Sequence, residues 1–440
     1  MVAGCYILQP ALPIPDMPPA AFSSIRVKLA GYLTAAGLVC LTIFPFFLFY
    51  SRALSDTFAS VIGGLFLLHS ALLKDWYWLK QPWLKLAALF CMLCLLSSVH
   101  VGITGEWVQA LCLPRLFLFC IALQSWLLST QARRIWMERL CLLAALWLIS
   151  QCWQQYLTGT NLMGMPRWGD GSLTGPFTKP RAGFTLLMLF FPGIMPSVLR
   201  LLRHNKLKYW ALGCLLLLLG VTTMVLIGQR MSCVLLFFGM SLTAFIFPRF
   251  RLPFGLILAC AGGLIASLPV ISPPVYAKLV LKFSDQLHHF AQSDYGRLFR
   301  SALVMVAQHP WMGLGMDGFR NFCHEPIQTH AFSFLGMETL GNDTDRGCNI
   351  HPHNYYLQVA TTAGLPGLIV FIGLAFLWLR AGWQALDIED HPQQAMLFVA
   401  CCILLWPVTS TSAVFSFPTA GWLFLFVGWL LAASSSHKRA

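Results

Sequence analysis

The feature of this sequence that most constrains its fold is a succession of apolar runs, each close to the roughly 20 residues that a helix needs to cross a bilayer. In lipid, backbone N–H and C=O groups must find hydrogen-bond partners within the protein, and a helix supplies them within one segment. The sequence therefore predicts an all-α integral membrane protein with about 12 transmembrane helices. The expected spans are 29–49, 55–73, 84–100, 107–128, 139–157, 183–201, 209–227, 232–248, 253–271, 355–379, 395–410 and 417–433.

Composition supports lipid as the solvent of this chain. Apolar residues make up 58% of the sequence and charged residues only 10%, whereas soluble proteins carry about 25% charged residues. The net charge of +13 would suggest nucleic acid in a soluble protein. Here the basic residues cluster between apolar runs, which is typical of orientation in a membrane. We therefore predict contact with membrane lipids and no nucleic-acid partner.

The distribution of Lys and Arg predicts the orientation. With the N-terminus in the cytoplasm, the cytoplasmic segments hold 17 of these residues, and the short loops of the other side hold five. Cytoplasmic loops carry such an excess in membrane proteins. An even number of spans also returns the basic C-terminus to the cytoplasm, so we expect both termini to be cytoplasmic.

This topology divides the chain into a cytoplasmic tail (1–28), nine spans (29–271) that include an outer loop (158–182), a large outer segment (272–354), three spans (355–433) and a second tail (434–440). Loops of this length in compact proteins are usually functional or disordered, and 272–354 is too apolar for disorder. Apolar residues recur at helical spacing between Tyr295 and Val306, with Arg297 and Arg300 on the opposite face. The pattern predicts a helix that lies on the membrane or caps the bundle.

The strongest local signal is HPHNYYLQ at residues 351–358, where the large outer segment re-enters the membrane, followed by AGLPG at 363–367. An imidazole at the mouth of a helix is well placed for proton transfer. A histidine that anchors a helix end at the interface is an equally good reading of this pattern alone.

Four segments together resemble the O-antigen ligase and polymerase superfamily. HPHNYYLQ with AGLPG is similar to its signature, LTGPFTKP (173–180) to its first outer-loop motif, and QRMS (229–232) to its short outer turn carrying an Arg. YGR (295–297) and HPWMGLGMDGF (309–319) resemble the stretch that precedes its catalytic histidine. The segments follow in the expected order over residues 170–370, about half of the chain, and all are predicted on the outer side.

The resemblance implies residue roles. Members of the family move a glycan from a polyprenyl-diphosphate carrier to an acceptor hydroxyl. His353 is then the base, and Arg230 and Arg297 bind the diphosphate, because Arg offers phosphate a permanently charged, forked donor. The further candidates are Arg300, Arg181 and Arg115 for the diphosphate, and Asn354, His351 and Lys179 in support.

The resemblance thus implies an O-antigen ligase in the bacterial inner membrane, with a periplasmic active site. The donor would be a glycan on undecaprenyl diphosphate and the acceptor a sugar hydroxyl of lipid A–core. We expect no cofactor and a metal-independent route, since the outer segments contain no acidic metal cluster. Alternatives are an O-antigen or exopolysaccharide polymerase and a protein O-oligosaccharyltransferase of the same superfamily. A flippase or transporter is a more distant alternative, because few ionisable residues fall at mid-membrane.

The sequence departs from the family pattern at two positions. Family members often have an acidic residue where this chain has Thr362, so any role of that carboxylate is absent or moved. The first motif commonly continues with Asn where this chain has Arg181. Arg181 either adds a phosphate contact or is a plain loop charge.

Other motifs have weaker interpretations. His351 and His353 offer two zinc ligands where three or four are needed, so we predict no metal site. GLGMDG (313–318) matches a dinucleotide-binding pattern without its strand and helix context, so its glycines are expected to shape a turn. Arg115, inside the fourth span, either faces the carrier phosphate or extends toward the outer surface.

Two cysteines, Cys323 and Cys348, are the only ones in the large outer segment. An oxidising periplasm permits their pairing, and a bridge would keep this segment near His353. Two free thiols are the alternative.

Overall fold

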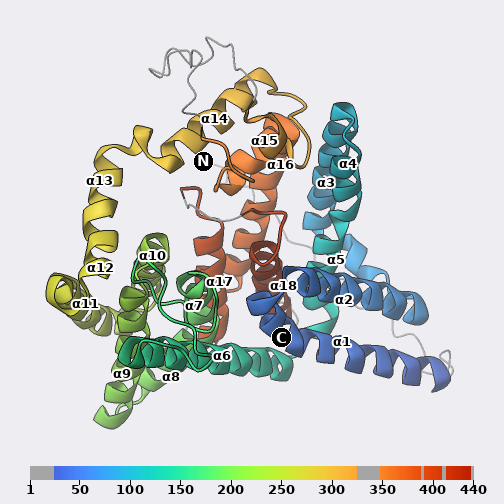
Figure 1. Cartoon of the computed structure of the whole chain (residues 1–440). Helices are drawn as coiled ribbons and strands as arrows, with labels where there is room; N and C mark the ends of the chain where they lie inside the picture. Colours follow the sequence, from blue (N-terminus) through green and yellow to red (C-terminus); the bar gives the residue numbers. More distant parts are fainter. Residues whose placement is uncertain (1–23, 325–346, 388–390, 409–412, 438–440) are drawn as a thin grey trace, which may run out of the picture.

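The computed structural model describes residues 24–324, 347–387, 391–408 and 413–437. Within these ranges all secondary-structure elements are helices, and β pairing is limited to an isolated bridge between Thr160 and Pro166. Figure 1 shows the helices packed around a central group, with one arm of helices arching over it. The predicted all-α membrane fold is confirmed. Much of both predicted tails, 1–23 and 438–440, lies outside the described residues.

The helices follow the predicted spans closely. The first half of the chain forms α1 (Ser24–Tyr50), α2 (Arg52–Leu73), η2 (Tyr77–Lys80), α3 (Pro82–Val101), α4 (Thr104–Cys112), α5 (Pro114–Ala122), η3 (Leu123–Leu127), α6 (Gln131–Thr158), α7 (Ala182–Leu189), η4 (Phe190–Ile194), α8 (Met195–Arg203) and α9 (Leu207–Ile227). The remainder forms α10 (Arg230–Ile246), η5 (Pro248–Phe250), α11 (Arg251–Ile271), α12 (Pro273–Tyr276), η6 (Ala277–Leu281), α13 (Lys282–His288), η7 (Phe290–Gln292), α14 (Asp294–Gln308), α15 (Gly318–Phe322), α16 (Tyr355–Gln384), α17 (Pro392–Leu404) and α18 (Thr419–His437).

Nine helical segments in the described part of the chain are long and apolar enough to cross a membrane. Two of them join several elements: Thr104–Leu127 contains α4, α5 and η3, and Ala182–Arg203 contains α7, η4 and α8. The spans predicted at 232–248, 395–410 and 417–433 overlap the shorter apolar helices α10, α17 and α18, and α17 ends at Leu404, before the end of the second of these spans. Residues 409–410 of that span lie outside the described residues. The count of twelve spans therefore stays a prediction.

The core lies around the segment Ala182–Arg203 and the helices α17 and α18. The most apolar window of Ala182–Arg203 is 89% buried, whereas that of Pro248–Ile271 is only 17% buried. The second segment is therefore peripheral, and much of its apolar surface is left to face lipid. Figure 1 shows the same arrangement, with α17 and α18 central and α11 at one edge.

A buried carboxylate joins three helices of the core. Glu138 of α6 is 3% exposed and accepts two hydrogen bonds from Arg200 of α8, at 2.5 and 2.6 Å. Gln393 at the start of α17 adds a third, at 2.8 Å. Because an unpaired buried carboxylate is strongly unfavourable, these partners fix α6, α8 and α17 relative to one another.

The two outer segments are connected to each other. Lys278 of η6 lies 2.6 Å from a carboxylate oxygen of Asp170 and 2.6 Å from the hydroxyl of Ser172, both in the first outer loop. From there α12, α13 and α14 form the arch seen in Figure 1. Helix α14 contains the helix predicted at 295–306 and packs on α16, which confirms that it caps the bundle.

Helix α16 is broken at Gly364. This residue has φ 65° and ψ −168°, a conformation open essentially only to glycine. The break frees the carbonyls of Thr361 and Thr362, which accept hydrogen bonds from the N–H groups of Leu314, at 2.8 Å, and Gly315, at 3.0 Å. The AGLPG sequence therefore marks the break in α16 at which the turn at 313–315 forms hydrogen bonds with this helix.

The glycines of GLGMDG shape this turn, as predicted. Gly313 and Gly315 have φ values of +71° and +82°. A Cβ atom on Gly313 would lie 2.5 Å from the carbonyl oxygen of Thr362. Ser97 of α3 completes the junction, because its hydroxyl donates to that same oxygen at 2.7 Å and accepts from the N–H of Gly315 at 3.0 Å.

We predict that Gly364→Ala destabilises the protein by more than about 2 kcal/mol. The backbone conformation alone costs about 1–3 kcal/mol for a non-glycine residue, and the new Cβ would lie 2.6 Å from the oxygen of Pro310. Thermal unfolding of the detergent-solubilised protein measures the change. The control is Gly255→Ala in α11, where a Cβ meets no atom within 4 Å and alanine favours the helix. Equal melting temperatures of the two variants would contradict the prediction.

Candidate functional site

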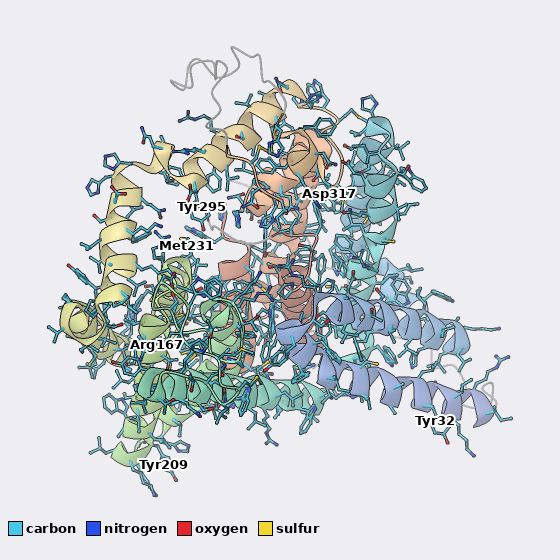
Figure 2. The ribbon with its side chains drawn as sticks, in the orientation of Figure 1. Tyr32, Arg167, Tyr209, Met231, Tyr295 and Asp317 are labelled. Atoms are coloured by element: carbon cyan, nitrogen blue, oxygen red, sulfur yellow. A yellow bond between two sulfur atoms is a disulfide. The ribbon has the colours of Figure 1, made fainter. Side chains whose placement is uncertain are left out.

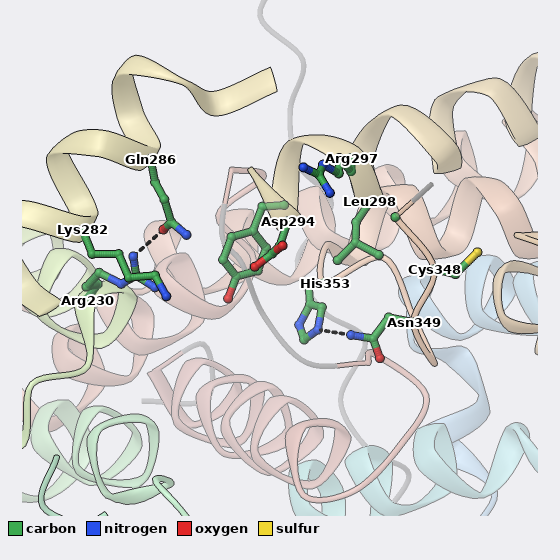
Figure 3. A pocket seen from close by; sticks show the side chains of 11 residues that line it. Arg230, Lys282, Gln286, Asp294, Arg297, Leu298, Cys348, Asn349 and His353 are labelled. Carbon is green, nitrogen blue, oxygen red and sulfur yellow. Dashed lines mark hydrogen bonds between the residues drawn. The ribbon is translucent and has the colours of Figure 1, made fainter. Parts of the chain in front are cut away.

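A cavity of about 390 Å³ opens between α10, α13, α14 and the loop that leads into α16. Figure 3 shows side chains from all four pointing toward it. It brings together Arg230, Arg297 and His353, which are far apart in the sequence. Among the described residues, the lining consists of Arg230, Lys282, Gln286, Asp294, Tyr295, Arg297, Leu298, Gly347, Cys348, Asn349 and His353.

The QRMS turn positions Arg230 at the first residue of α10. The side-chain oxygen of Gln229 accepts from the N–H of Phe184 at 3.1 Å, and its amide nitrogen donates to the carbonyl of Pro180. These bonds fasten the start of α10 to the end of the first outer-loop motif. Arg230 itself donates a hydrogen bond to the side-chain oxygen of Gln286 in α13, drawn as a dashed line in Figure 3.

Arg297 lies in the first turns of α14. Ser293 begins this helix by accepting a hydrogen bond from the N–H of Gly296 at 3.2 Å. The loop that leads to His353 passes directly beside it, since a Cβ on Gly347 would lie 2.4 Å from the backbone nitrogen of Leu298. Only glycine permits this approach, which brings the loop and α14 together at the cavity.

His353 has a left-handed backbone conformation, with φ 56°. Such a conformation is uncommon for residues other than glycine, although Asn, Asp and His adopt it more readily than most. A conformation of this kind costs about 1–3 kcal/mol and is typically found at functional sites. The His353 ring is perpendicular to that of Tyr295, with the centroids 5.7 Å apart.

A hydrogen bond orients the imidazole of His353. The side-chain oxygen of Asn349 accepts from the N–H of Ile350 at 2.7 Å, which identifies the other end of this amide as the NH2 group. That nitrogen lies 3.3 Å from Nε2 of His353. Asn349 is therefore a donor to Nε2, so the neutral imidazole carries its proton on Nδ1 and has Nε2 as a proton acceptor.

The remaining polar residues of HPHNYYLQ anchor α16. Asn354 begins the helix by accepting from the N–H of Leu357 at 3.1 Å, and its amide donates to the carbonyl of Pro407 at 2.7 Å. The hydroxyl of Tyr356 donates a hydrogen bond to the backbone carbonyl of Leu405 at 2.6 Å. This part of the motif thus fixes the helix whose first turn adjoins His353.

His351 is a buried neighbour of His353. Their ring centroids are 4.3 Å apart, and His351 is 6% exposed. Burial, and then the electrostatic interactions with His353 and Arg52, lower the pKa of His351 to about 4. Its Nε2 atom has no hydrogen-bond partner among the described residues. His351 is therefore a neutral imidazole at pH 7 with a polar atom that is not satisfied.

The other predicted arginines and Lys179 are not part of the cavity lining. Arg115 makes a two-pronged ion pair with Asp56 of α2, at 2.7 and 2.9 Å. Arg300 donates to the carbonyl of Ala291 at 3.4 Å. Lys179 is exposed. Arg181 is half-buried, and burial together with the charge of Arg52 lowers its pKa.

Sequence reasoning missed four polar residues of the cavity, which are Lys282, Gln286, Asp294 and Asn349, and one buried carboxylate. Lys282 and Gln286 are four residues apart in α13, so both fall on the same helix face. Asp294 adds the carboxylate of the lining. The only signal for Lys282 and Gln286 was polar residues at helical spacing.

The missed buried carboxylate is Glu106, in the first turn of α4. It is 1% exposed and accepts a hydrogen bond from Asn321 at 2.6 Å. It also lies against Gly315, whose N–H is bonded to the carbonyl of Thr362. A carboxylate is thus present beside the turn at 313–315, which donates a hydrogen bond to the carbonyl of Thr362. Thr362 itself stands where the family pattern often has an acidic residue.

Cys323 and Cys348 are joined by a disulfide, with their Cα atoms 5.5 Å apart. The bridge connects the end of α15 to the residue before Asn349, and so to the loop that carries His353. Potential metal ligands of Cys323, His324 and Cys348 lie within 4.8 Å of one another. Both sulfur atoms are already bonded in the disulfide, which leaves His324 alone in this group as a ligand.

The fold and the cavity define a helical membrane protein with a cationic site beside an imidazole. Figure 2 shows the side chains of the whole molecule, with Tyr295 of the cavity lining labelled on the arch. Residues 214–372 match the family model described as O-antigen ligase, and this segment contains Arg230, Arg297 and His353. This segment is therefore similar to the O-antigen ligase family, and the resemblance predicted from the motifs is confirmed. The family implies a membrane enzyme of glycosyl transfer that uses a lipid-linked glycan. A comparison with curated proteins gives no match.

We predict that the loop carrying His351 becomes less stable as the pH falls. The unfolded residue binds a proton near pH 6.5, whereas the folded residue binds one only near pH 4. The stability that depends on neutral His351 is therefore complete above about pH 6.5 and is lost as the pH falls toward 4. Hydrogen exchange of residues 349–358 between pH 7 and 4 measures this change.

His351→Gln should reduce this pH dependence, because glutamine cannot gain the proton. His309→Gln, at an exposed site, should retain the wild-type profile. Identical profiles for wild type and His351→Gln would contradict the assignment.

Proposed function

We propose that this protein is an O-antigen ligase. It transfers a polysaccharide from an undecaprenyl diphosphate carrier to a sugar hydroxyl of lipid A–core, at the periplasmic face of the bacterial inner membrane. The observation that carries the proposal is the common cavity of Arg230, Arg297 and His353. A base and two guanidinium groups at one site match the two demands of this reaction, which are an activated hydroxyl and a stabilised diphosphate.

The cationic side chains suit a diphosphate leaving group. Negative charge develops on the diphosphate as its bond to the sugar breaks, and fixed positive charge lowers the energy of that state. Arg230 and Arg297 supply forked donors whose charge does not depend on pH. Lys282 adds a third cation, so the described residues of the lining include three cationic side chains and one carboxylate, that of Asp294.

His353 accepts the proton in the proposed step. The acceptor hydroxyl displaces the Asn349 amide from Nε2 and gives its proton to that atom, while its oxygen bonds to the anomeric carbon. The bond between that carbon and the phosphate oxygen breaks, and the electron pair leaves with the carrier diphosphate. His353 then returns the proton to water. Atoms and charge balance with side chains alone, so we propose a metal-independent route without a cofactor.

Reconstitution tests the proposal. Purified protein receives a carrier-linked glycan and, in separate reactions, lipid A–core, a second carrier-linked glycan or a peptide as acceptor. Glycosylated lipid A–core with release of carrier diphosphate is the expected result. Transfer only to the glycan or to the peptide would replace the ligase by a polymerase or by a protein glycosyltransferase. Movement of the carrier across the bilayer without any product would indicate a flippase.

We predict that His353→Asn lowers transfer by about 100-fold or more, the contribution typical of a general base. Asparagine tolerates the left-handed backbone of this position, so the fold should remain intact. Initial rates and thermal unfolding are measured on the same preparation. His309→Asn, at an exposed position of the outer segment, is the matched control. Near-normal turnover by His353→Asn would remove His353 from the mechanism.

We predict that Arg230→Gln and Arg297→Gln each weaken use of the donor by about tenfold or more, which corresponds to the loss of a hydrogen bond between charged groups. Lysine at either position should rescue only in part, because it lacks the forked geometry. Titration of the donor at fixed acceptor concentration measures the effect. Arg320→Gln, an exposed arginine of α15 outside the lining, is the control. Donor use at wild-type level in both variants would refute the diphosphate assignment.

A further inference from the structure

A second cavity, of about 350 Å³, lies outside the candidate site. Phe66 and Ser70 of α2 line it together with Gln124 and Trp126 of η3 and Ser435 of α18. These three elements are distant in the sequence, and the segment between α2 and α3 also contributes to the lining. None of the roles proposed above uses any residue of this lining.

Helix α3 separates this cavity from the outer segment. Ser97 and Ser98, near the end of α3, accept hydrogen bonds from the turn that begins at Gly313, at 3.0 and 3.1 Å. Gln81, directly before the first residue of α3, lines the cavity. A helix of 20 residues extends about 30 Å, which is the thickness of the hydrocarbon core of a bilayer. The cavity therefore lies at the end of α3 far from the arch, on the side predicted to be cytoplasmic.

Aromatic rings form part of the cavity lining. The ring centroid of Phe66 lies 5.2 Å from that of Trp78 and 6.0 Å from that of Trp126. The indole N–H of Trp78 donates to the hydroxyl of Ser70 at 3.1 Å. The indole N–H of Trp126 donates to the hydroxyl of Thr34 at 3.0 Å. Because both donors are used within the protein, the two indoles offer a ligand only carbon atoms and π electrons, which attract cations.

The charges of the cavity also favour a cationic ligand. Among the described residues of the lining, Asp75 supplies the one carboxylate, and none is Lys or Arg. Asp75 forms no ion pair with Lys or Arg in the described part of the chain. Its Oδ1 atom accepts a hydrogen bond from the N–H of Tyr77 at 3.1 Å, which orients the carboxylate.

A positive charge stands directly outside the lining. The ammonium of Lys80 lies 4.9 Å from the ring centroid of Tyr77, which itself lines the cavity. A carboxylate at the cavity and an ammonium beside it match a zwitterion, with its own ammonium directed inward and its phosphate outward. An anionic ligand would instead bring its charge toward Asp75.

Exposed aromatic residues place the cavity at the level of lipid headgroups. Trp76 and Tyr77 follow the end of α2, and their exposed fractions are 45% and 60%. Trp and Tyr are enriched where a membrane meets water. A lipid headgroup beside α2 would therefore lie level with the cavity, and its concentration there is set by the membrane itself.

We propose that this cavity binds the amine headgroup of an aminophospholipid of the phosphatidylethanolamine class. The lipid ammonium contacts Asp75 and the aromatic rings, the phosphate lies toward Lys80, and the acyl chains remain in the bilayer. A bound headgroup would connect α2, η3 and α18 at the face opposite the arch. The assignment does not depend on the transfer reaction proposed above, because it concerns other residues at the other end of α3.

Calorimetric titration of the full-length protein in a neutral maltoside detergent tests the site. The probes are dihexanoyl phosphatidylethanolamine, dihexanoyl phosphatidylglycerol, which keeps the phosphate and chains without the amine, and ethanolamine, which keeps only the amine. The pH is 8, where an imidazole is neutral, because His69 also lines the cavity. We expect phosphatidylethanolamine to bind about tenfold or more tightly than either other probe, as for one charge-assisted hydrogen bond.

Two variants locate the binding. Asp75→Asn removes the charge but keeps an oxygen for the N–H of Tyr77, so we expect affinity for phosphatidylethanolamine to fall about tenfold with the fold intact. Its control is Asp285→Asn, at an exposed carboxylate outside this lining. Tyr77→Leu should weaken binding about threefold, as for a lost cation–π contact. Its control is Tyr32→Leu, at an exposed tyrosine of α1.

Three outcomes would overturn the proposal. Equal affinities for phosphatidylethanolamine and phosphatidylglycerol would show that the amine is not recognised. Ethanolamine that binds as tightly as the lipid would assign the cavity to a soluble amine. Wild-type affinity in Asp75→Asn, with an unchanged melting temperature, would place the lipid elsewhere. If Asp75→Asn does not fold, the comparison of Tyr77→Leu with Tyr32→Leu decides, and equal affinities of these two variants would refute the site.

Discussion

The position of the proposed base depends on a break in a transmembrane helix. At Gly364 two turns of α16 separate, and the carbonyls of Thr361 and Thr362 accept hydrogen bonds from the turn at 313–315. Non-helical backbone at membrane depth is tolerated only where protein satisfies its polar groups. The turn satisfies them here, and it thereby connects the large outer segment to α16. The cavity lies between α14 and the loop that carries His353, which belong to the two segments joined by this connection.

Charge placement follows from the same architecture. Arginine within a bilayer is costly unless it is paired, and Arg115 and Arg200 are both paired with carboxylates. Arg230, Arg297 and Lys282 instead gather at the first turns of their helices, where the outer segment meets the bundle. A lipid-borne diphosphate would approach from this boundary, because its chain stays in the membrane while its headgroup requires polar contacts. Arg115 and Arg200 therefore fit a structural role, and Arg230 and Arg297, which line the cavity, are the ones proposed to bind the diphosphate.

Much of the fold could be predicted from the sequence, because the lipid environment imposes a length and a hydrogen-bonding rule on each span separately. The helix at 294–308 and the turn at 313–315 were likewise encoded locally, by apolar spacing and by glycine. Contacts between distant segments were not. Arg115 stood out as an intramembrane charge, but its partner Asp56 is 59 positions away. Lys282 and Gln286 reach the cavity because α13 lies beside Arg230 of α10, which no local pattern indicates.

The environment of Thr362 shows that a residue missing from a sequence motif can be matched by a residue from a distant part of the chain. The sequence lacks an acidic residue at this position, yet Glu106 of α4 places a buried carboxylate at the adjoining turn, where Asn321 of α15 donates to it. Cys323 follows α15 directly, and its bond to Cys348 continues this connection to Asn349 and hence to His353. The imidazole is therefore restrained from two directions, through the broken helix and through the disulfide. A left-handed backbone of this kind persists only where the surrounding structure holds it, and these two connections restrain the loop that carries His353.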